Sequence, residues 1–302
     1  MTIEHARTHA IPKVWGVVDL CPWSSASDDG PIGEIWYERA RKTAADPSLL
    51  IKLLFTSQPL SIQVHPDEEF AHSIGLPSGK TEAWYVLSAT PDARIALGLQ
   101  RRLTPEELRE AIGDGSIADL VVWHAVSPND VIFIPAGTIH AIGPGLVIAE
   151  IQQRIDSTFR MHDFGRKREL HVENAIAVAD AGPIEASAEK FRLTDERTLL
   201  VANSHFVFER IDLEPNSTWC LEAEQETWLL IVSGSARIGP FDAAIGDAIF
   251  AQSDRANVCA GPTGMAGLAA YTGGKPIPHL LQRIKQPGAI NAGPRQDVQV
   301  PT

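Results

Sequence analysis

Short apolar runs separated by turn-forming residues are the dominant pattern of the chain. Runs of about five to seven residues recur between stretches rich in Gly, Pro, Asn and Asp. Half-buried strands have this length, whereas amphipathic helices need longer periodic segments. The pattern predicts a mainly β, mostly antiparallel protein, with strands near residues 49–55, 84–87, 131–134, 146–149, 206–213 and 228–232.

Helical signals are few. Thr104, Pro105 and Glu107 supply an N-cap, a proline in the first turn and a capping-box glutamate, and Gly113 is the expected stop. These residues predict a short helical insertion near 104–113. A second helix is expected around residues 173–179.

An internal repeat divides the chain. The segment Glu82-Ala-Trp-Tyr-Val-Leu-Ser is echoed by Glu226-Thr-Trp-Leu-Leu-Ile-Val-Ser, and Asn129-Asp-Val-Ile-Phe is echoed by Gly246-Asp-Ala-Ile-Phe. Two copies of one β-barrel unit account for both echoes. We therefore expect one domain over residues 1–180, a second over 190–285, and a carboxy-terminal tail over 286–302.

Charge and cysteine content limit the classes of partner. A formal net charge of −12 repels nucleic acid and anionic lipid, and the chain has no basic run that would offset it. No segment has the roughly 18 consecutive apolar residues of a membrane span, and the start lacks the order of a signal peptide. Cys21, Cys220 and Cys259 form no Cys-x-x-Cys pair. We expect a cytoplasmic protein without a nucleic-acid or membrane partner, whose metal ligands, if any, are nitrogen and oxygen.

Four polar residues have the pattern of a metal site. Gln63 and His65 are two residues apart among β-branched residues, so a strand would point both side chains to one face. Glu82 begins another apolar run, and the spacing Pro-x-Gly-x-x-His ends at His140. Two imidazoles, a carboxylate and an amide oxygen suit Zn²⁺ or another borderline divalent ion.

The spacing before His140 is typical of a cupin (jelly-roll) barrel, in which Pro and Gly shape a tight turn that directs the histidine into the barrel mouth. The second copy has Asn257 at the position of His140 and no Gln-x-His segment. We therefore expect a degenerate second barrel without a metal. Five histidines without comparable pairing are expected to be structural or exposed: His72, His124, His162, His171 and His205.

Several longer motifs resemble one family. The chain is similar to the type I mannose-6-phosphate isomerases, zinc-dependent cupin enzymes, over about its first 175 residues. The run Glu-Ile-Gln-Gln-Arg-Ile-Asp-Ser-Thr-Phe-Arg at 150–160, followed by Asp163 and Arg166, is the most diagnostic. The other matching segments are Lys13-x-Trp15-Gly16, Gly33-Glu34-x-Trp36, Gln63-Val64-His65-Pro66-Asp67 and Gly79-Lys80-Thr81-Glu82-Ala83-Trp84-Tyr85.

The resemblance implies an aldose–ketose isomerase that interconverts mannose 6-phosphate and fructose 6-phosphate through an enediol. It also implies one Zn²⁺ per chain, held by Gln63, His65, Glu82 and His140. Arg160 matches the family's active-site arginine. For the group that moves the proton, Glu150, Lys80 and a zinc-bound water remain alternatives.

A sugar phosphate is the expected small-molecule partner, and cations should hold its phosphate. Lys80 is the first candidate, followed by Lys52, Arg154 and Arg166. Asp156 and Asp163 are expected to pair with the arginines. Trp15, Trp36 and Trp84 are expected in the core or the pocket wall.

Two other functions fit parts of the pattern. An Fe²⁺-dependent cupin oxygenase would share the barrel, but Gln63 stands where such a site would have another histidine. A non-catalytic cupin that binds sugar phosphates is the other alternative. Ile155 and Phe159 replace the family's Ser and Tyr, and the loss of two hydroxyls near the expected site predicts an altered substrate preference.

Overall fold

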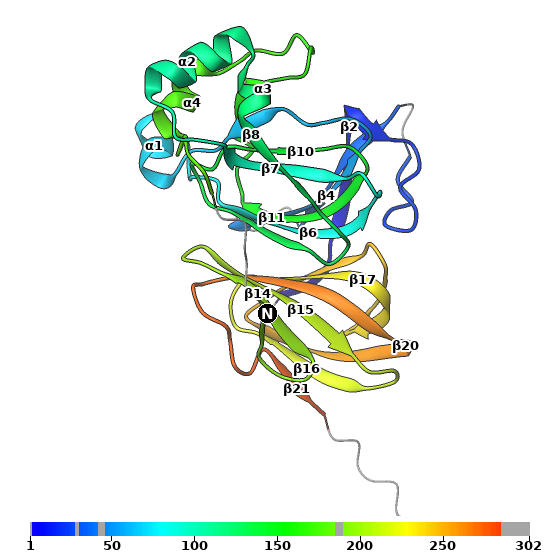
Figure 1. The fold of residues 1–302 in the computed structure, drawn as a ribbon. Coiled ribbons are helices and arrows are strands. Elements are labelled where there is room, and N and C mark those ends of the chain that lie inside the picture. The colour runs from blue at the N-terminus through cyan, green and yellow to red at the C-terminus, as the bar shows by residue number, and fades with distance from the viewer. Residues whose placement is uncertain (1, 28–29, 42–45, 185–189, 285–302) are drawn as a thin grey trace, which may run out of the picture.

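The computed structural model describes residues 2–27, 30–41, 46–184 and 190–284. Strands dominate, which confirms the mainly β prediction, and two stacked groups of sheets make up the molecule (Figure 1). Four short helices lie at one end: α1 (Glu68–Ser73), α2 (Pro105–Asp114), α3 (Ile117–Leu120) and α4 (Val172–Val178). The described part of the chain has no helix of the length and apolarity that crossing a membrane requires.

Two antiparallel sheets form the upper half of the molecule in Figure 1. The six-stranded sheet has the order β2 (Arg7–Val17), β3 (Ile32–Glu38), β4 (Leu49–Thr56), β11 (Leu146–Gln153), β6 (Glu82–Ala89) and β9 (Val131–Ile134). The five-stranded sheet has the order β12 (Phe159–His162), β5 (Ile62–Val64), β10 (His140–Ile142), β7 (Arg94–Leu99) and β8 (Val121–Ala125). Leu54 and Trp84 of the first sheet pack with Leu97 and Ile142 of the second.

A ten-stranded sheet forms the lower half. Its main path is β1 (Thr2–His5), β19 (Ala248–Gln252), β17 (Thr227–Ile238), β20 (Asp254–Thr272), β15 (Phe206–Leu213), β14 (Arg197–Ala202) and β13 (Phe191–Arg192). Three further strands extend it: β16 (Thr218–Ala223), β18 (Phe241–Ala244) and β21 (Leu281–Arg283). The amino-terminal strand β1 thus pairs with β19, across the expected division at residues 180–190. The division into domains stays a prediction.

The expected barrels are not closed by hydrogen bonds. The strand pairings of the described residues form three open sheets. The internal repeat nevertheless has a structural counterpart, because β6 pairs with β9 and β11 while the matching β17 pairs with β19 and β20. Both copies of the repeat therefore occupy equivalent places in their sheets.

An apolar core joins the two halves. Ile35 and Ile51 of the six-stranded sheet belong to the same buried cluster as Phe206, Trp228 and Phe250 of the ten-stranded sheet. Each of these side chains is at most 1% exposed. Burial of a large apolar side chain contributes roughly 1.5–3 kcal/mol, so this layer strongly favours the two halves staying together.

The helices and strands that the sequence signals predicted are present in the structure. Thr104 caps α2 with the full capping box, but the helix runs to Asp114 because Gly115, in the left-handed region at φ 84°, ends it instead of Gly113. The helix expected at 173–179 is α4. The predicted strands near 131–134 and 206–213 are β9 and β15. The expected tail over 286–302 lies outside the described residues.

Candidate active site

Three neighbouring strands align the polar residues of the predicted metal site. In the five-stranded sheet, Gln63 of β5 stands opposite His140 of β10 on one side and opposite Arg160 of β12 on the other. His65 follows two residues after Gln63, and Glu82 begins β6 in the facing sheet. Residues from four segments of the chain therefore meet between the two sheets.

His65, Glu82 and His140 form a buried group. One ligand atom from each lies within 4.8 Å of the others. The Nε2 atoms of His65 and His140 are each 3.5 Å from a Glu82 carboxylate oxygen. Gln63 adjoins the group, with its Nε2 3.3 Å from His140 Nε2, and its Oε1 accepts a hydrogen bond from Ser61. The four residues expected from the sequence are thus brought together, and an exchange of the Gln63 amide atoms would point its oxygen at the group.

Backbone carbonyls orient both imidazoles. His65 Nδ1 lies 2.9 Å from the Ser157 carbonyl, and His140 Nδ1 lies 2.9 Å from the Thr138 carbonyl. Because these Nδ1 atoms donate, the Nε2 lone pairs face Glu82. Burial and the neighbouring His65 lower the pKa of His140 to about 3, so its imidazole is neutral, as a metal ligand must be.

Glu82 is a buried carboxylate whose negative charge requires a cation close by. It is 0% exposed, and neither carboxylate oxygen accepts a hydrogen bond within the described structure. Lys80 Nζ lies 3.0 Å from Glu82 Oε2 and 3.1 Å from His65 Nε2, so the ammonium occupies the place of a cation. Burial alone would lower the pKa of Lys80, but the carboxylates of Glu82 and Glu150 outweigh it and raise that pKa. Lys80 therefore stays protonated.

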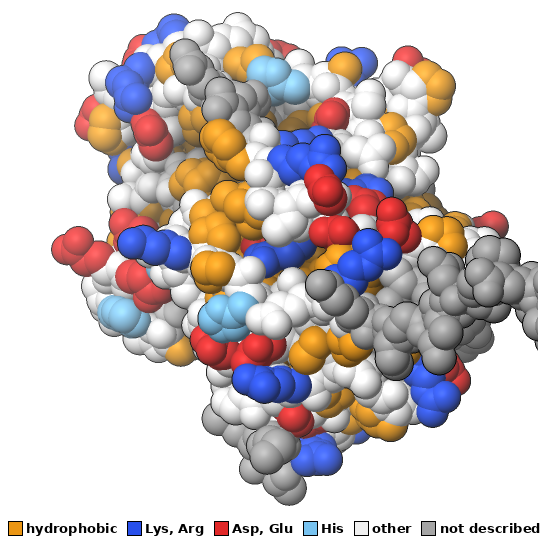
Figure 2. Space-filling view, turned by 90° about the horizontal axis from the view of Figure 1, so that it is seen from below, with side chains coloured by type: hydrophobic (Ala, Val, Ile, Leu, Met, Phe, Trp, Pro, Cys, Tyr) orange, Lys and Arg blue, Asp and Glu red, His pale blue; other side chains and the backbone are white. Residues whose placement is uncertain are grey.

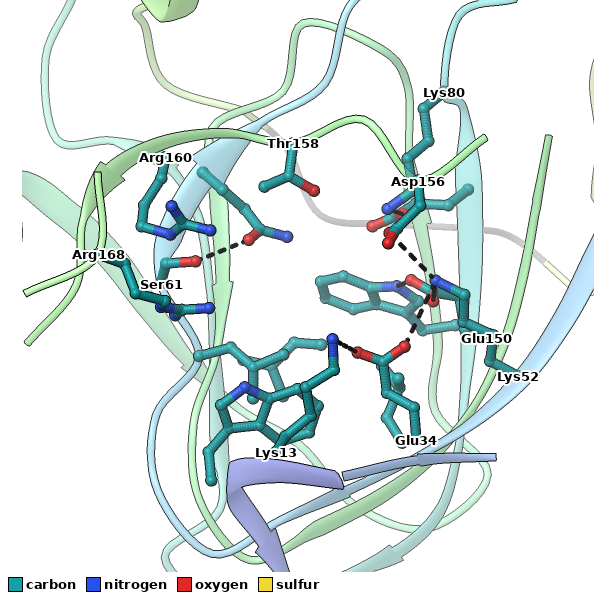
Figure 3. A pocket seen from close by; sticks show the side chains of 17 residues that line it. Lys13, Glu34, Lys52, Ser61, Lys80, Glu150, Asp156, Thr158, Arg160 and Arg168 are labelled. Atoms are coloured by element: carbon teal, nitrogen blue, oxygen red, sulfur yellow. Dashed lines mark hydrogen bonds and ion pairs between the residues drawn. The ribbon is translucent and has the colours of Figure 1, made fainter. Parts of the chain in front are cut away.

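A hollow of about 220 Å³ adjoins this group. Figure 3 shows Ser61, Thr158, Arg160 and Arg168 gathered on one side of it. A cluster of carboxylates around Lys52 lies on the other side. The pocket thus has an arginine side and a carboxylate side.

Lys52 is the centre of the carboxylate side. It is 3% exposed, and its Nζ lies 3.7 Å from Glu34, 3.6 Å from Glu150 and 3.7 Å from Asp156. Trp36 packs beneath it, with the ring centroid 4.6 Å from Nζ. Burial, and then the charge of Glu82, raise the pKa of Glu150 to about 7. Trp84 Nε1 donates to Glu150 at 3.1 Å, which fixes the position of that carboxyl.

Arg160 and Arg168 carry the positive charge of the opposite side. Arg160 Nη1 donates to the Glu169 carbonyl at 2.7 Å, while its Nε is buried and has no partner among the described residues. Burial, and then the charge of Arg168, lower the pKa of Arg160. Asp163 accepts hydrogen bonds from Arg166 and Arg168 and sets their positions. Three guanidinium groups around one aspartate leave this side strongly positive.

The expected phosphate-binding cations separate in the structure. Lys80 lies in the metal group, and Lys52 is surrounded by carboxylates. Arg166 bonds to Asp163 and to the Pro59 carbonyl and does not line the pocket. Arg154 lines a different hollow. These positions could not be predicted from the sequence, because each depends on contacts between distant segments.

Lys13 and Arg168 were missed as lining residues, and the expected pairing of Asp156 was wrong. Lys13, which pairs with Glu34 at 3.1 Å, and Arg168 both line the pocket, and their neighbourhood in the family motifs was the only available signal. Asp156 pairs with Lys52 and not with an arginine. Phe159 packs against Phe70 in the core beside the helices, with ring centroids 5.8 Å apart, and neither it nor Ile155 lines the pocket. Of the three tryptophans, Trp15 and Trp84 form pocket wall, as expected.

A second group of possible ligands lies in the ten-stranded sheet. It comprises Glu222, Glu224 and His279, which are partly or fully exposed. Arg255 already pairs with Glu222, and His279 lies 3.0 Å from Glu224. These residues satisfy one another at the surface, in contrast to the buried Glu82 group. The expectation that the second repeat lacks a metal stays a prediction.

Comparisons with known proteins agree with the motifs. The chain is 38% identical over 188 residues to the mannose-6-phosphate isomerase of Streptococcus mutans, covering 58% of this chain and 59% of that protein. It is 41% identical over 144 residues to a mannose-6-phosphate isomerase of Bacillus subtilis, covering 45% of each chain. The chain thus spans about three fifths or less of these relatives. No family model matches it.

Solved structures match over nearly the whole fold. The mannose 6-phosphate isomerase of Bacillus subtilis has a TM-score of 0.79 at 21% identity, covering 90% of this chain and 100% of that one. A mutant of phosphomannose isomerase from Salmonella typhimurium has a TM-score of 0.73 at 14% identity, with the same coverage. The chain therefore resembles the mannose-6-phosphate isomerases in sequence and has their fold.

Proposed function

We propose that the protein is a zinc-dependent aldose–ketose isomerase that interconverts mannose 6-phosphate and fructose 6-phosphate. The observation that carries the proposal is the buried Glu82 carboxylate, which lies between two inward-facing imidazoles, accepts no hydrogen bond from the described residues and has the Lys80 ammonium 3.0 Å from it. A carboxylate in such a place is costly unless a cation compensates it. The sequence similarity indicates which reaction to propose, and the adjoining pocket can hold a sugar.

The donor set fits a borderline divalent ion. His65, Glu82 and His140, with the Gln63 amide beside them, offer two nitrogens and two oxygens, and none of the three cysteines takes part. One such ion per chain, zinc in this proposal, would supply Lewis-acid stabilisation of the sugar oxygens that become negative in the enediolate. Lys80 Nζ would then have to leave its present place between His65 and Glu82.

Proton transfer between C1 and C2 is assigned to Glu150. Its carboxyl lines the pocket, and its pKa of about 7 lets it take up and release a proton near neutral pH. Lys80 lines the same pocket, but its raised pKa makes it a poor base. Lys80 instead contributes positive charge beside the reacting oxygens. Lys52 and the Trp84 indole hold Glu150 in place.

The arginine side of the pocket suits the phosphate of the substrate. Arg160 and Arg168, with the hydroxyls of Ser61 and Thr158, present donors that match phosphate oxygens. The carboxylates around Lys52 would repel the same group. The sugar phosphate is therefore expected to lie with its phosphate near Arg160 and its C1 and C2 near Glu82 and Glu150.

A coupled assay tests the proposal. Purified protein is supplied with mannose 6-phosphate, and formation of fructose 6-phosphate is followed together with the zinc content of the sample. We expect turnover with about one zinc per chain. Binding of the sugar phosphate without any isomerisation by zinc-loaded protein would contradict the proposal and would favour a non-catalytic sugar-phosphate-binding protein.

A further inference from the structure

A second hollow lies where the two halves of the molecule meet. It measures about 680 Å³ and has no lining residue in common with the metal pocket. Segments from both halves line it: the start of β4, the loop after α1 and the end of β11 from the upper half, and the turn between β14 and β15 and the end of β20 from the lower half. A cavity at such a junction is a common place for a small ligand.

Arg154 is the residue that distinguishes this hollow. It lines the hollow, and its Nη1 atom is buried without a hydrogen-bond partner within the described structure. A guanidinium is always charged, so an unpartnered buried nitrogen of this group is costly. The proposed isomerase reaction makes no use of Arg154, because the side chain lies outside the catalytic pocket.

Most of the other polar side chains around the hollow can donate a hydrogen bond. His205 and the hydroxyls of Ser48, Ser78, Ser204 and Thr272 line it. One guanidinium with several hydroxyl donors suits a phosphoryl group, whose oxygens accept from several directions. An apolar ligand would leave these donors without partners.

Two acidic residues face the same region. Asp46 lines the hollow and is exposed. Glu68 lies behind it, 3.9 Å from His205 Nδ1, and accepts a hydrogen bond from Gln153 Nε2 at 2.5 Å. Glu68 is thus engaged by its own donors, while Asp46 can keep its charge in solvent. Within the described structure, neither residue pairs with the Arg154 guanidinium.

We propose that this hollow binds the phosphoryl group of a small molecule, with Arg154 as its main charged partner, at a site separate from the metal pocket. The neighbouring Gln153 links the site to the metal segment, because its side-chain oxygen accepts from the Thr81 N–H at 2.9 Å. Thr81 lies between Lys80 and Glu82. A ligand at Arg154 therefore sits one residue from a side chain that positions the metal-binding strand.

Equilibrium dialysis with radiolabelled inorganic phosphate tests this proposal on the full chain. Arg154→Leu removes the charge at the hollow, and Arg102→Leu is the matched control, because Arg102 is exposed and pairs with Asp180 at the surface. We expect the wild type and Arg102→Leu to bind one more phosphate per chain than Arg154→Leu. Arg168→Leu, which alters only the catalytic pocket, should keep the Arg154-dependent phosphate.

Equal phosphate binding by Arg154→Leu and the wild type would overturn the proposal, as would a wild type that binds no phosphate. Circular dichroism and thermal melting check that the variant is folded. If Arg154→Leu does not fold, Ser204→Glu replaces it, because this exposed turn residue tolerates substitution and the new carboxylate would repel phosphate. Ser204→Glu should also lose one bound phosphate, and unchanged binding would again overturn the proposal.

Discussion

At the scale of single residues, the buried charges of Glu82 and of Lys80, which lies two residues before it, compensate each other. Glu82 is fully buried, and burial alone would raise its pKa, but the Lys80 ammonium outweighs burial and lowers that pKa, so the carboxylate is ionised. Lys80 satisfies part of this charge with its own ammonium. The proposed zinc ion would take over that role and free the lysine for the substrate. Without a metal, Lys80 thus supplies the positive charge beside Glu82 that the proposed zinc ion would supply when bound.

Replacement of Arg160 tests the arginine side of the pocket. Arg160→Ala should lower turnover of mannose 6-phosphate about 100- to 1000-fold, because a permanent positive charge near the reacting sugar phosphate is lost. Bound zinc should stay near the wild-type content, since Arg160 contacts none of the four proposed ligands through its side chain. Steady-state kinetics and metal analysis of the same sample measure both quantities.

Arg102→Ala is the control for this replacement, because Arg102 pairs with Asp180 at the surface and neither residue lines the pocket. The control should keep wild-type turnover. Ordinary turnover by Arg160→Ala would remove the role assigned to this residue. Loss of zinc by Arg160→Ala would instead make it a structural part of the metal site.

The ionisation of Asp163 should make the free energy of unfolding depend on pH. Burial would raise its pKa, but Arg168 and Arg166 outweigh burial and lower it below 3.8. The folded state therefore favours the ionised form, and this stabilisation is present above the ordinary pKa and is lost as the pH falls through the lowered one. The free energy of unfolding of the metal-free protein should therefore drop as the pH falls below about 4.

Urea unfolding of the wild type and Asp163→Asn measures this contribution. Asp163→Asn should be less stable than the wild type at pH 7, and the difference should shrink at pH 3. A difference between the two proteins that stays constant with pH would contradict the assigned role of the ion pairs.

At the scale of elements, the equivalent glutamates of the two repeat copies make different contacts. Glu82 begins β6 and Glu226 directly precedes the matching strand β17, and each lies two residues before a buried tryptophan, Trp84 or Trp228. Glu82 faces the imidazoles, whereas Glu226 accepts hydrogen bonds from the backbone N–H groups of Ser48 and Leu49 at 2.6 and 2.9 Å. In the second copy the carboxylate thus ties β17 to the start of β4, and β4 carries Lys52.

Glu226→Gln tests this link between the halves. The amide nitrogen would face a backbone donor in place of an acceptor, so we expect a loss of about 1–3 kcal/mol in the free energy of unfolding. Glu224→Gln is the control, because this neighbour is exposed and should change stability by less than about 0.5 kcal/mol. Equal stability of Glu226→Gln and the wild type in urea would contradict the role of Glu226.

Local pattern was enough for the predicted strands and helices and for the convergence of the four proposed metal ligands. The two-residue spacing of Gln63 and His65 and the turn before His140 specify strand geometry directly, so their convergence was predictable. The pairing of β1 with β19 was not, because it joins residues more than 240 positions apart. The positions of Arg154 and Arg168 also depend on the direction that the loop takes after its strand. The sequence around them has no hydrophobic periodicity that would specify this direction.

At the scale of the whole molecule, charge is distributed unevenly. The chain carries a formal net charge of −12, and Figure 2 shows basic and acidic side chains interspersed on the face that it draws. In the pocket, by contrast, Arg160 and Arg168 gather on one side, and the carboxylates around Lys52 lie on the other. A local excess of positive charge can attract a sugar phosphate at contact range, because the distant negative field is screened beyond about 8–10 Å.

The most direct test of the account follows zinc and turnover in the same sample. Chelator-treated protein is assayed for conversion of mannose 6-phosphate before and after stepwise addition of Zn²⁺, beside a Glu82→Gln variant. We predict that turnover disappears with the metal, returns in proportion to zinc up to about one ion per chain, and stays absent in Glu82→Gln. Full turnover by protein that is verified to be metal-free would contradict the account.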